Sequence, residues 1–182
     1  MVVRMDTDWT TRAETPADRA AVRGVNLAAF PTADEADLVD ALRADPAAWI
    51  DGLSIVAVDG AGGGAGGGDG TVVGHALLTR CHIGEEPALC LAPCAVLPEY
   101  QRTGAGSAAV RAALAAAVEQ GERWVVVLGH PGYYPRFGFG RAGAHGIRIS
   151  IDVPDEALMA LALDPAHPLP AGLVHYAQPF GI

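Results

Sequence analysis

The chain has 182 residues, of which 51% are hydrophobic and only 18% are charged, with a formal net charge of −9. That length and apolar fraction suit one packed domain over residues 1–182 and exclude a disordered chain. The negative charge repels phosphate backbones, which excludes nucleic-acid binding through a basic face, and it mildly favours a cationic partner such as an amine.

The first residues, Met1–Asp6, contain no apolar signal-peptide core, and no window reaches the roughly 18 apolar residues that a membrane span needs. We therefore expect a cytoplasmic protein without a membrane partner, in which Cys81, Cys90 and Cys94 are reduced thiols. These cysteines lie near two histidines on neighbouring predicted strands, but no pair has the spacing of a zinc site. We favour buried apolar thiols over a metal site, so no metal is expected.

The first part of the chain predicts a strand followed by two helices. The strand covers residues 9–14, and Thr15 and Pro16 then supply an N-cap and a proline at the first helical position. Pro31 ends this first helix, and a second helix is expected over residues 33–44.

Two strands follow, at residues 53–58 and 71–78, and a glycine-rich tract separates them. Eight of the eleven residues 60–70 are glycine. No lysine follows these glycines and the next element is a strand, which excludes a phosphate-binding P-loop. The tract is therefore expected to be a flexible connection between two strands of a hairpin.

The rest of the chain mixes strands with one long helix. The expected elements, in order, are a strand at 88–97, a helix at 106–120 capped by Gly121, a strand at 123–129, a short helical turn at 131–139, and strands at 158–163 and 173–176. Val110, Leu114 and Val118 are expected to form the packing face of the helix. This order indicates an α/β (α+β) domain with a mixed sheet.

The most informative segment is the turn that precedes this helix. It reads Gln101-Arg102-Thr103-Gly104-Ala105-Gly106 and follows a strand that ends in Leu97-Pro98. A glycine-containing turn at a helix N-terminus can wrap backbone N–H groups around a phosphate and place the phosphate charge at the positive end of the helix. The turn therefore predicts a pyrophosphate site.

This turn resembles the acyl-CoA pyrophosphate motif of the GNAT N-acetyltransferase superfamily, (Gln/Arg)-x-x-Gly-x-(Gly/Ala), at every defined position. Further along, Tyr133-Tyr134-Pro135-Arg136-Phe137-Gly138-Phe139 resembles the family's aromatic-Tyr-x-x-x-Gly-Phe segment. The preceding Gly129-His130-Pro131 resembles a bacterial branch of predicted acetyltransferases. The resemblance implies the GNAT fold, a strongly twisted mixed sheet of about six to seven strands with helices on both faces.

The resemblance also implies acetyl-CoA as the cosubstrate. In this family the strand before the motif is bulged and directs a free N–H, matched here by Val96, at the thioester oxygen, as an oxyanion hole does. Ordinary ladder pairing of that N–H is the alternative. The implied cofactor-binding residues are Ala95, Val96, Leu97, Gln101, Arg102, Thr103, Gly104, Ala105, Gly106 and Ser107.

The resemblance implies catalytic roles as well. Tyr134 matches the family's general-acid tyrosine, and Tyr133 is the competing candidate. A phenol with a pKa of about 10 can donate a proton to the thiolate of CoA when it is well placed. The family's glutamate base has no counterpart on the strand, because residues 88–97 contain no carboxylate. The residues that stay open for this catalytic role are Glu99, Glu85, Glu86 and His130.

Together these features predict an N-acetyltransferase that moves the acetyl group of acetyl-CoA to a primary amine by direct attack in a ternary complex. Cys94 lies where packing is expected, which disfavours a covalent acetyl intermediate on its thiol. Two alternatives stay open: a non-catalytic acyl-CoA-binding sensor or interaction module, and a transferase of longer acyl groups. No motif identifies the acceptor, a small-molecule or protein amine, and a homodimer through the C-terminal strands also stays open.

Overall fold

The computed structural model of the protein describes residues 9–60 and 70–182, so most of the glycine-rich tract lies outside the described residues. The helices are α1 (Arg19–Ala29), α2 (Asp34–Ala44) and α3 (Ala105–Glu119). The strands are β1 (Thr10–Ala13), β2 (Ser54–Asp59), β3 (Thr71–Ile83), β4 (Glu86–Val96), β5 (Trp124–Leu128), β6 (Gly140–Arg141), β7 (Ile147–Arg148), β8 (Leu158–Ala162) and β9 (Gly172–His175). Short 3₁₀ turns are η1 (Pro16–Asp18), η2 (Pro98–Tyr100), η3 (Tyr134–Phe137), η4 (Ala142–His145), η5 (Asp155–Ala157) and η6 (Gln178–Phe180).

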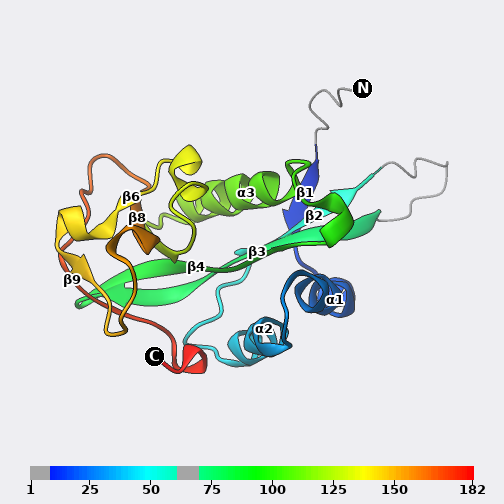
Figure 1. Cartoon of the computed structure of the whole chain (residues 1–182), viewed down its shortest axis with the longest axis horizontal. Coiled ribbons are helices and arrows are strands. Elements are labelled where there is room, and N and C mark those ends of the chain that lie inside the picture. The colour runs from blue at the N-terminus through cyan, green and yellow to red at the C-terminus, as the bar shows by residue number, and fades with distance from the viewer. Residues whose placement is uncertain (1–8, 61–69) are drawn as a thin grey trace.

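The strands form a mixed sheet in the order β1-β2-β3-β4-β5-β8-β6, with β9 paired to β3 and to β7. The pairs β4–β5 and β7–β9 are parallel and the others are antiparallel. Helix α3 covers one face of the sheet, and α1 and α2 cover the other (Figure 1). The predicted mixed sheet with helices on both faces is confirmed. The described residues contain nine strands, more than predicted, because β6 and β7 are too short for an alternating pattern to mark them.

Strand β3 is longer than the sequence predicts. It continues to Ile83, whereas the apolar run ends at residue 78, just before a stretch that includes Arg80 and His82. The antiparallel ladder to β4 extends the strand, with Arg80 opposite Leu89 and His82 opposite Pro87. Tertiary pairing thus overrides the loss of the local hydrophobic pattern.

Helix α3 presents mainly small side chains to the sheet. Its buried residues are Ala105, Gly106, Ala109, Val110, Ala113, Leu114 and Ala117. The expectation that Val118 belongs to this face is wrong, because its side chain is 53% exposed. In a helix with 3.6 residues per turn, each four-residue step rotates by about 40°, so Val118 has turned away and Ala117 takes its place. Gly121 (φ 78°) follows the helix in the left-handed conformation, as its predicted capping role requires.

Strands β4 and β5 separate after a short contact. Their parallel ladder contains the pairs Leu89–Val125 and Cys90–Val126, although both strands continue beyond it. Near Pro93, β4 carries one extra residue relative to β3, and proline has no N–H to give to a ladder. The backbone of the last residues of β4 therefore lacks a neighbour on the β5 side, which opens the middle of the sheet.

A chain of buried polar side chains fastens α1 to the sheet. The fully buried ring of His75 on β3 places Nδ1 3.2 Å from Asn26 Nδ2 and Nε2 2.9 Å from Ser54 Oγ. The Ser54 hydroxyl donates to Glu14, whose carboxylate pairs with Arg43 at 2.5 Å. Because Asn26 belongs to α1 and Ser54 to β2, the chain fixes the end of this helix relative to β3 and β2.

Burial keeps the His75 imidazole neutral. It lowers the pKa of His75 to about 3, and the charge of Arg43 acts in the same direction. Glu14 Oε2 lies 4.0 Å from Nε2, but this carboxylate is already paired with Arg43, so desolvation prevails. The ring therefore takes part in the chain as a neutral hydrogen-bonding group.

This neutral histidine makes the stability depend on pH. The unfolded chain protonates His75 below its ordinary pKa of about 6.5, whereas the folded chain resists protonation, so stability is lost as the pH falls. Between pH 7 and pH 5 the free energy of unfolding should drop by about 2 kcal/mol through this residue. Asp18, whose pKa the Arg12 guanidinium lowers, loses its contribution only below about pH 4.

Urea unfolding of the wild type and of His75→Gln at the two pH values measures this contribution. The variant starts from a lower stability, but its free energy of unfolding should change less between the two conditions because glutamine does not titrate. An equal pH dependence in both proteins would show that His75 is not held neutral by the fold.

Candidate functional site

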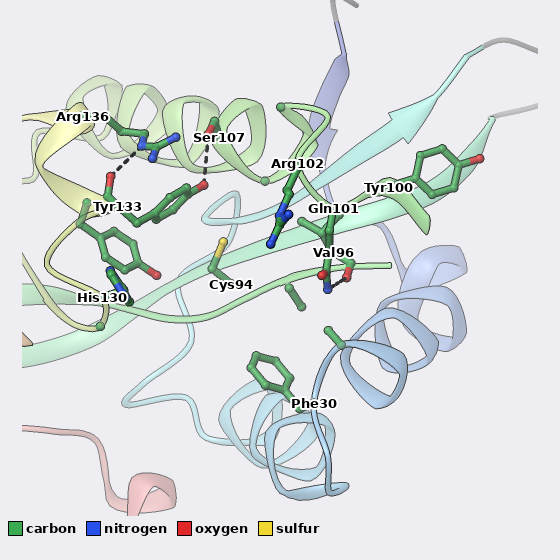
Figure 2. Close-up of a pocket in the computed structure, with 16 residues that line it drawn as sticks. Phe30, Cys94, Val96, Tyr100, Gln101, Arg102, Ser107, His130, Tyr133 and Arg136 are labelled. Atoms are coloured by element: carbon green, nitrogen blue, oxygen red, sulfur yellow. Dashed lines mark hydrogen bonds between the residues drawn. The ribbon is translucent and has the colours of Figure 1, made fainter. Parts of the chain in front are cut away.

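A cavity of about 700 Å³ lies where β4 and β5 diverge. The N-terminus of α3 borders it on one side and the end of α1 on the other (Figure 2). It gathers residues that the sequence predicts for the site, namely Ala95, Val96, Gln101, Arg102, Gly104, Gly106, Ser107, Tyr133 and Tyr134. Segments far apart in the chain thus contribute to one hollow.

The turn before α3 directs backbone N–H groups towards this cavity. Arg102 (φ 61°) and Gly104 (φ 92°) both adopt the left-handed region. Such residues within a turn bring successive N–H groups to one side and form an anion-binding nest. The side chain of Arg102 points from the turn into the cavity (Figure 2). The turn therefore combines oriented N–H groups with a positive charge.

Helix α3 adds further donors at the same place. The N–H of Ala108 donates to the Gly104 carbonyl at 2.9 Å. The preceding N–H groups, those of Ala105, Gly106 and Ser107, have no partner within the helix, as is usual for a first turn. The positive end of the helix dipole lies with them. This arrangement can hold a phosphate or pyrophosphate without any lysine.

Gly106 allows α3 to approach β4 closely. A Cβ at this position would come 2.9 Å from Val96 Cγ2 and 3.5 Å from the Tyr133 hydroxyl. The first of these distances is shorter than side chains tolerate, so an alanine here would displace Val96. The glycine therefore sets the narrow spacing between the nest and the end of β4.

Val96 presents its backbone to the gap between the strands. The N–H of Leu97 donates to the Val73 carbonyl of β3 at 2.9 Å. Because backbone groups alternate in direction along a strand, the N–H and C=O of Val96 face away from β3. Gln101 Nε2 donates to this Val96 carbonyl at 3.3 Å (Figure 2). Of the three predicted neighbours Ala95, Val96 and Leu97, Val96 is thus the one whose N–H faces the cavity.

Tyr133 links the segment after β5 to α3. Its hydroxyl lies 3.1 Å from Ser107 Oγ, and Arg136 Nε donates to its carbonyl at 2.8 Å (Figure 2). The Arg136 guanidinium also stacks over the ring, 4.3 Å from its centroid. Burial raises the pKa of Tyr133, and the bond to Ser107 partly offsets this rise. Its hydroxyl is therefore engaged in a structural contact.

Tyr134 packs against the end of β5. Its ring occupies the space that a Cβ on Gly129 would need, and Phe139 meets it edge to face at 5.9 Å between centroids. Burial, with the nearby Cys94 thiol, raises the pKa of Tyr134 well above its ordinary value. The phenol therefore keeps its proton at neutral pH, and its hydroxyl donates to no side chain of the described residues.

Cys94 lines the cavity beside these groups, but its thiol is poorly suited to nucleophilic attack. Burial raises its pKa to about 12, so the thiolate is scarcely populated at neutral pH. Cys81 and Cys90 are buried among apolar side chains, and burial raises their pKa values too. All three are free thiols.

The candidates for a general base lie less favourably. Glu99 is exposed on η2 and outside the described lining of the cavity, and Glu85 and Glu86 are next to each other at the distant β3–β4 turn. His130 does line the cavity, but its Nδ1 accepts the Gly132 N–H at 3.0 Å. In the neutral ring the proton then sits on Nε2, which leaves no free lone pair. A base role for Glu99 stays a prediction.

Three predicted cofactor residues lie outside the described lining of the cavity, namely Leu97, Thr103 and Ala105. The Thr103 hydroxyl donates to the Tyr100 carbonyl at 2.5 Å, and Ala105 is buried in the core beneath α3. Sequence reasoning missed other residues that line the cavity, namely Ala29, Phe30 and Tyr100. Phe30 precedes the proline that ends the first helix and carries no motif, so only the packing of α1 on the sheet reveals it.

Neither a metal cluster nor a membrane span is present in the part of the chain that the structure describes. No three of its His, Cys, Asp and Glu side chains gather closely enough to bind a metal ion. His75 bonds to Asn26 and Ser54 instead. No helix of residues 9–60 and 70–182 combines the length and hydropathy needed to cross a membrane.

Comparison with known proteins gives concordant matches. The model of the Acetyltransferase (GNAT) family matches residues 28–139. The uncharacterised N-acetyltransferase YjhQ of Escherichia coli K12 is 38% identical over 144 residues, which cover 76% of this chain and 74% of that protein. The uncharacterised N-acetyltransferase YhbS of the same strain is 30% identical over 172 residues, which cover 93% and 96% of the two chains.

Solved structures agree with these sequence matches. The crystal structure of YhbS from Escherichia coli in complex with CoA superimposes with a TM-score of 0.84 at 27% identity, covering 100% of this chain and 97% of that one. A GNAT family acetyltransferase from Brucella melitensis in complex with acetyl-CoA gives a TM-score of 0.72 at 32% identity, covering 96% and 99%. The predicted family and its bacterial relatives are confirmed.

The packing of Tyr134 on Gly129 can be tested through stability. Gly129→Ala would place a methyl group inside the tyrosine ring and should lower the free energy of unfolding by about 1–3 kcal/mol, as overpacking does. The matched control is Gly24→Ala in α1, where a Cβ meets nothing within 4 Å. That change should stabilise the protein by about 0.5–1 kcal/mol. Urea unfolding that found both variants equally stable would contradict this packing.

Proposed function

The chain belongs to the acetyltransferase (GNAT) family, and from this premise we propose that it transfers the acetyl group of acetyl-CoA to a primary amine by direct attack in a ternary complex. We propose further that residues 1–182 act as a single domain of this kind. The observation that carries the proposal is the convergence, in one cavity, of an anion-binding nest with the N–H of Val96 and the hydroxyl-bearing ring of Tyr134.

The residues of the cavity fit CoA chemically. The first-turn N–H groups of α3 and the nest at Arg102 and Gly104 suit a pyrophosphate. Gly106 lets the nest lie close to the end of β4, where a Cβ would meet the Val96 side chain. Beyond it, the unpaired backbone edge of β4 offers hydrogen-bonding groups to an extended, amide-containing chain such as pantetheine. Relatives solved with CoA and acetyl-CoA support this assignment.

When bound, acetyl-CoA supplies an activated acetyl thioester whose leaving group is a thiolate. The Val96 N–H, fixed by the β3–β4 ladder, would donate to the acetyl oxygen as negative charge develops on it. The Tyr134 phenol would give its proton to the departing sulfur, and the proton that the attacking nitrogen loses would restore the phenol by way of solvent. A phenol is protonated at neutral pH before transfer, and because burial raises its pKa, the transfer depends on its placement, which Gly129 and Phe139 set.

The amine must be neutral when it attacks. The lone pair on His130 Nδ1 is occupied, and the described lining of the cavity contains no carboxylate. We propose that the amine loses its proton to solvent, with Glu99, exposed beside the turn, as the nearby carboxylate that assists. The lack of a free base within the described lining also keeps a non-catalytic CoA-binding module as the second candidate.

The general-acid assignment is tested by Tyr134→Phe. This variant should retain its Kd for acetyl-CoA and lose kcat by about 10²–10⁴-fold, the usual contribution of a positioned acid. Tyr133→Phe is the matched control, because it removes the neighbouring hydroxyl and the contact with Ser107. A thiol-release assay over a panel of amines measures the rates, and calorimetry measures the affinities.

A larger loss of kcat in Tyr133→Phe than in Tyr134→Phe would transfer the acid role to Tyr133. Binding of CoA without thiol release for any acceptor, longer acyl donors included, would favour the non-catalytic module. Absence of CoA binding by the wild-type chain would overturn the proposal as a whole.

Direct attack is tested by Cys94→Ala. If no covalent acetyl-cysteine forms, kcat should change by less than about threefold, since only packing is altered, and the initial-rate pattern should be sequential. Transfer through the Cys94 thiol predicts ping-pong kinetics and loss of turnover in this variant. The high pKa of this partly buried thiol favours the first outcome.

A further inference from the structure

The side chain of Trp9, near the start of the chain, contacts the turn at residues 101–106 that precedes α3. The indole Nε1–H of Trp9 donates to the Thr103 carbonyl at 3.1 Å, across 94 residues of sequence. The same indole lies against Gly104, where a Cβ would come 3.8 Å from Nε1. Trp9 is not one of the described residues that line the cavity, whereas Gly104, against which its indole lies, does line it.

This hydrogen bond fixes the direction of one peptide group. In a planar trans peptide the C=O of one residue and the N–H of the next point in opposite directions. Because the Thr103 carbonyl points to Trp9, the N–H of Gly104 points away from Trp9, and Gly104 is one of the residues that line the cavity. The left-handed φ of Gly104 permits this orientation. A rotated peptide would turn a carbonyl oxygen towards the phosphate and repel it.

Neighbouring contacts hold Trp9 itself in place. The Tyr100 ring meets the indole edge to face, with 5.8 Å between ring centroids. The Tyr100 hydroxyl donates to Asp59 at 2.8 Å, and the Tyr100 carbonyl accepts the Thr103 hydroxyl. β1 and β2, which pair in the sheet, thus support the turn through Trp9, which directly precedes β1, and Asp59 at the end of β2.

We propose that Trp9 is a positioning residue for the CoA pyrophosphate, acting through the Thr103–Gly104 peptide group. The inference rests on the proposed function, since it presupposes that the nest binds this pyrophosphate. Trp9 affects the affinity for acetyl-CoA, whereas Val96 and Tyr134 act in the acetyl-transfer step. No family motif marks this residue, because the contact depends on the packing of the first strand beneath the turn.

The test is Trp9→Phe, which keeps an aromatic ring against Tyr100 and removes the N–H donor. Trp124→Phe is the matched control, because Trp124 Nε1 also donates to a backbone carbonyl, that of His167, at 3.0 Å and away from the cavity. Calorimetry with CoA should show a Kd about 3- to 10-fold weaker for Trp9→Phe, the loss expected for one hydrogen bond, and an unchanged Kd for Trp124→Phe.

Kinetics add a second readout that a general loosening of the fold would not give. Trp9→Phe should raise the KM for acetyl-CoA and preserve kcat, and it should turn over S-acetylpantetheine, which lacks the pyrophosphate, as the wild type does. If wild type binds CoA and Trp9→Phe binds it equally well, or if Trp124→Phe weakens CoA binding to the same extent, the positioning role is wrong. If the wild type itself does not bind CoA, the proposed function fails instead.

Should Trp9→Phe not fold, the ¹⁵N-labelled wild type answers the same question. Addition of CoA should shift the indole N–H resonance of Trp9 and leave that of Trp124 unchanged. An unmoved Trp9 resonance at saturating CoA would overturn the inference.

Discussion

The parallel ladder between β4 and β5 stops after two residue pairs, and the site depends on this interruption. A continuous ladder would consume the N–H and C=O of Val96 in the sheet and close the space that the cavity occupies. Pro93 and the extra residue beside it end the regular pairing on β4, while β5 stays paired with β8 along its length. Polar backbone thus becomes available to a ligand inside an otherwise apolar core.

The elements around the gap between β4 and β5 place polar groups and side chains at its edges. The close approach of α3, permitted by Gly106, brings a helix N-terminus to the rim, and Trp9 orients the peptide group that precedes the helix. On the opposite face, the neutral His75 holds Asn26 and with it the end of α1, which carries Phe30. Rigid elements on both faces therefore define the cavity, and this preorganisation is what an acetyl-transfer site requires.

Much of the fold and the donor side of the site could be predicted from the sequence. The Gln101–Gly106 turn could be recognised from its glycines, and Tyr134 from its spacing to Gly138, whereas the left-handed backbone of Arg102 has no sequence signal. The lining residue Phe30 could not be predicted, because only tertiary packing brings it to the cavity, and Tyr100, although next to Gln101 in the chain, carries no motif. The orientation that distinguishes Val96 from Leu97 likewise depends on the register with β3. The prediction that Val118 packs on the sheet was wrong for a geometric reason, because the buried face of a helix rotates along its length.

We propose that the end of β4 and the N-terminus of α3 form one CoA site. The most direct measurement is a titration of the ¹⁵N-labelled protein with CoA, followed through the backbone amide resonances. We expect the amides of Val96, Gly104 and Gly106 to shift together and to saturate at one Kd. Saturable shifts confined to another surface, or no shifts at millimolar CoA, would show that these two elements do not form a CoA site.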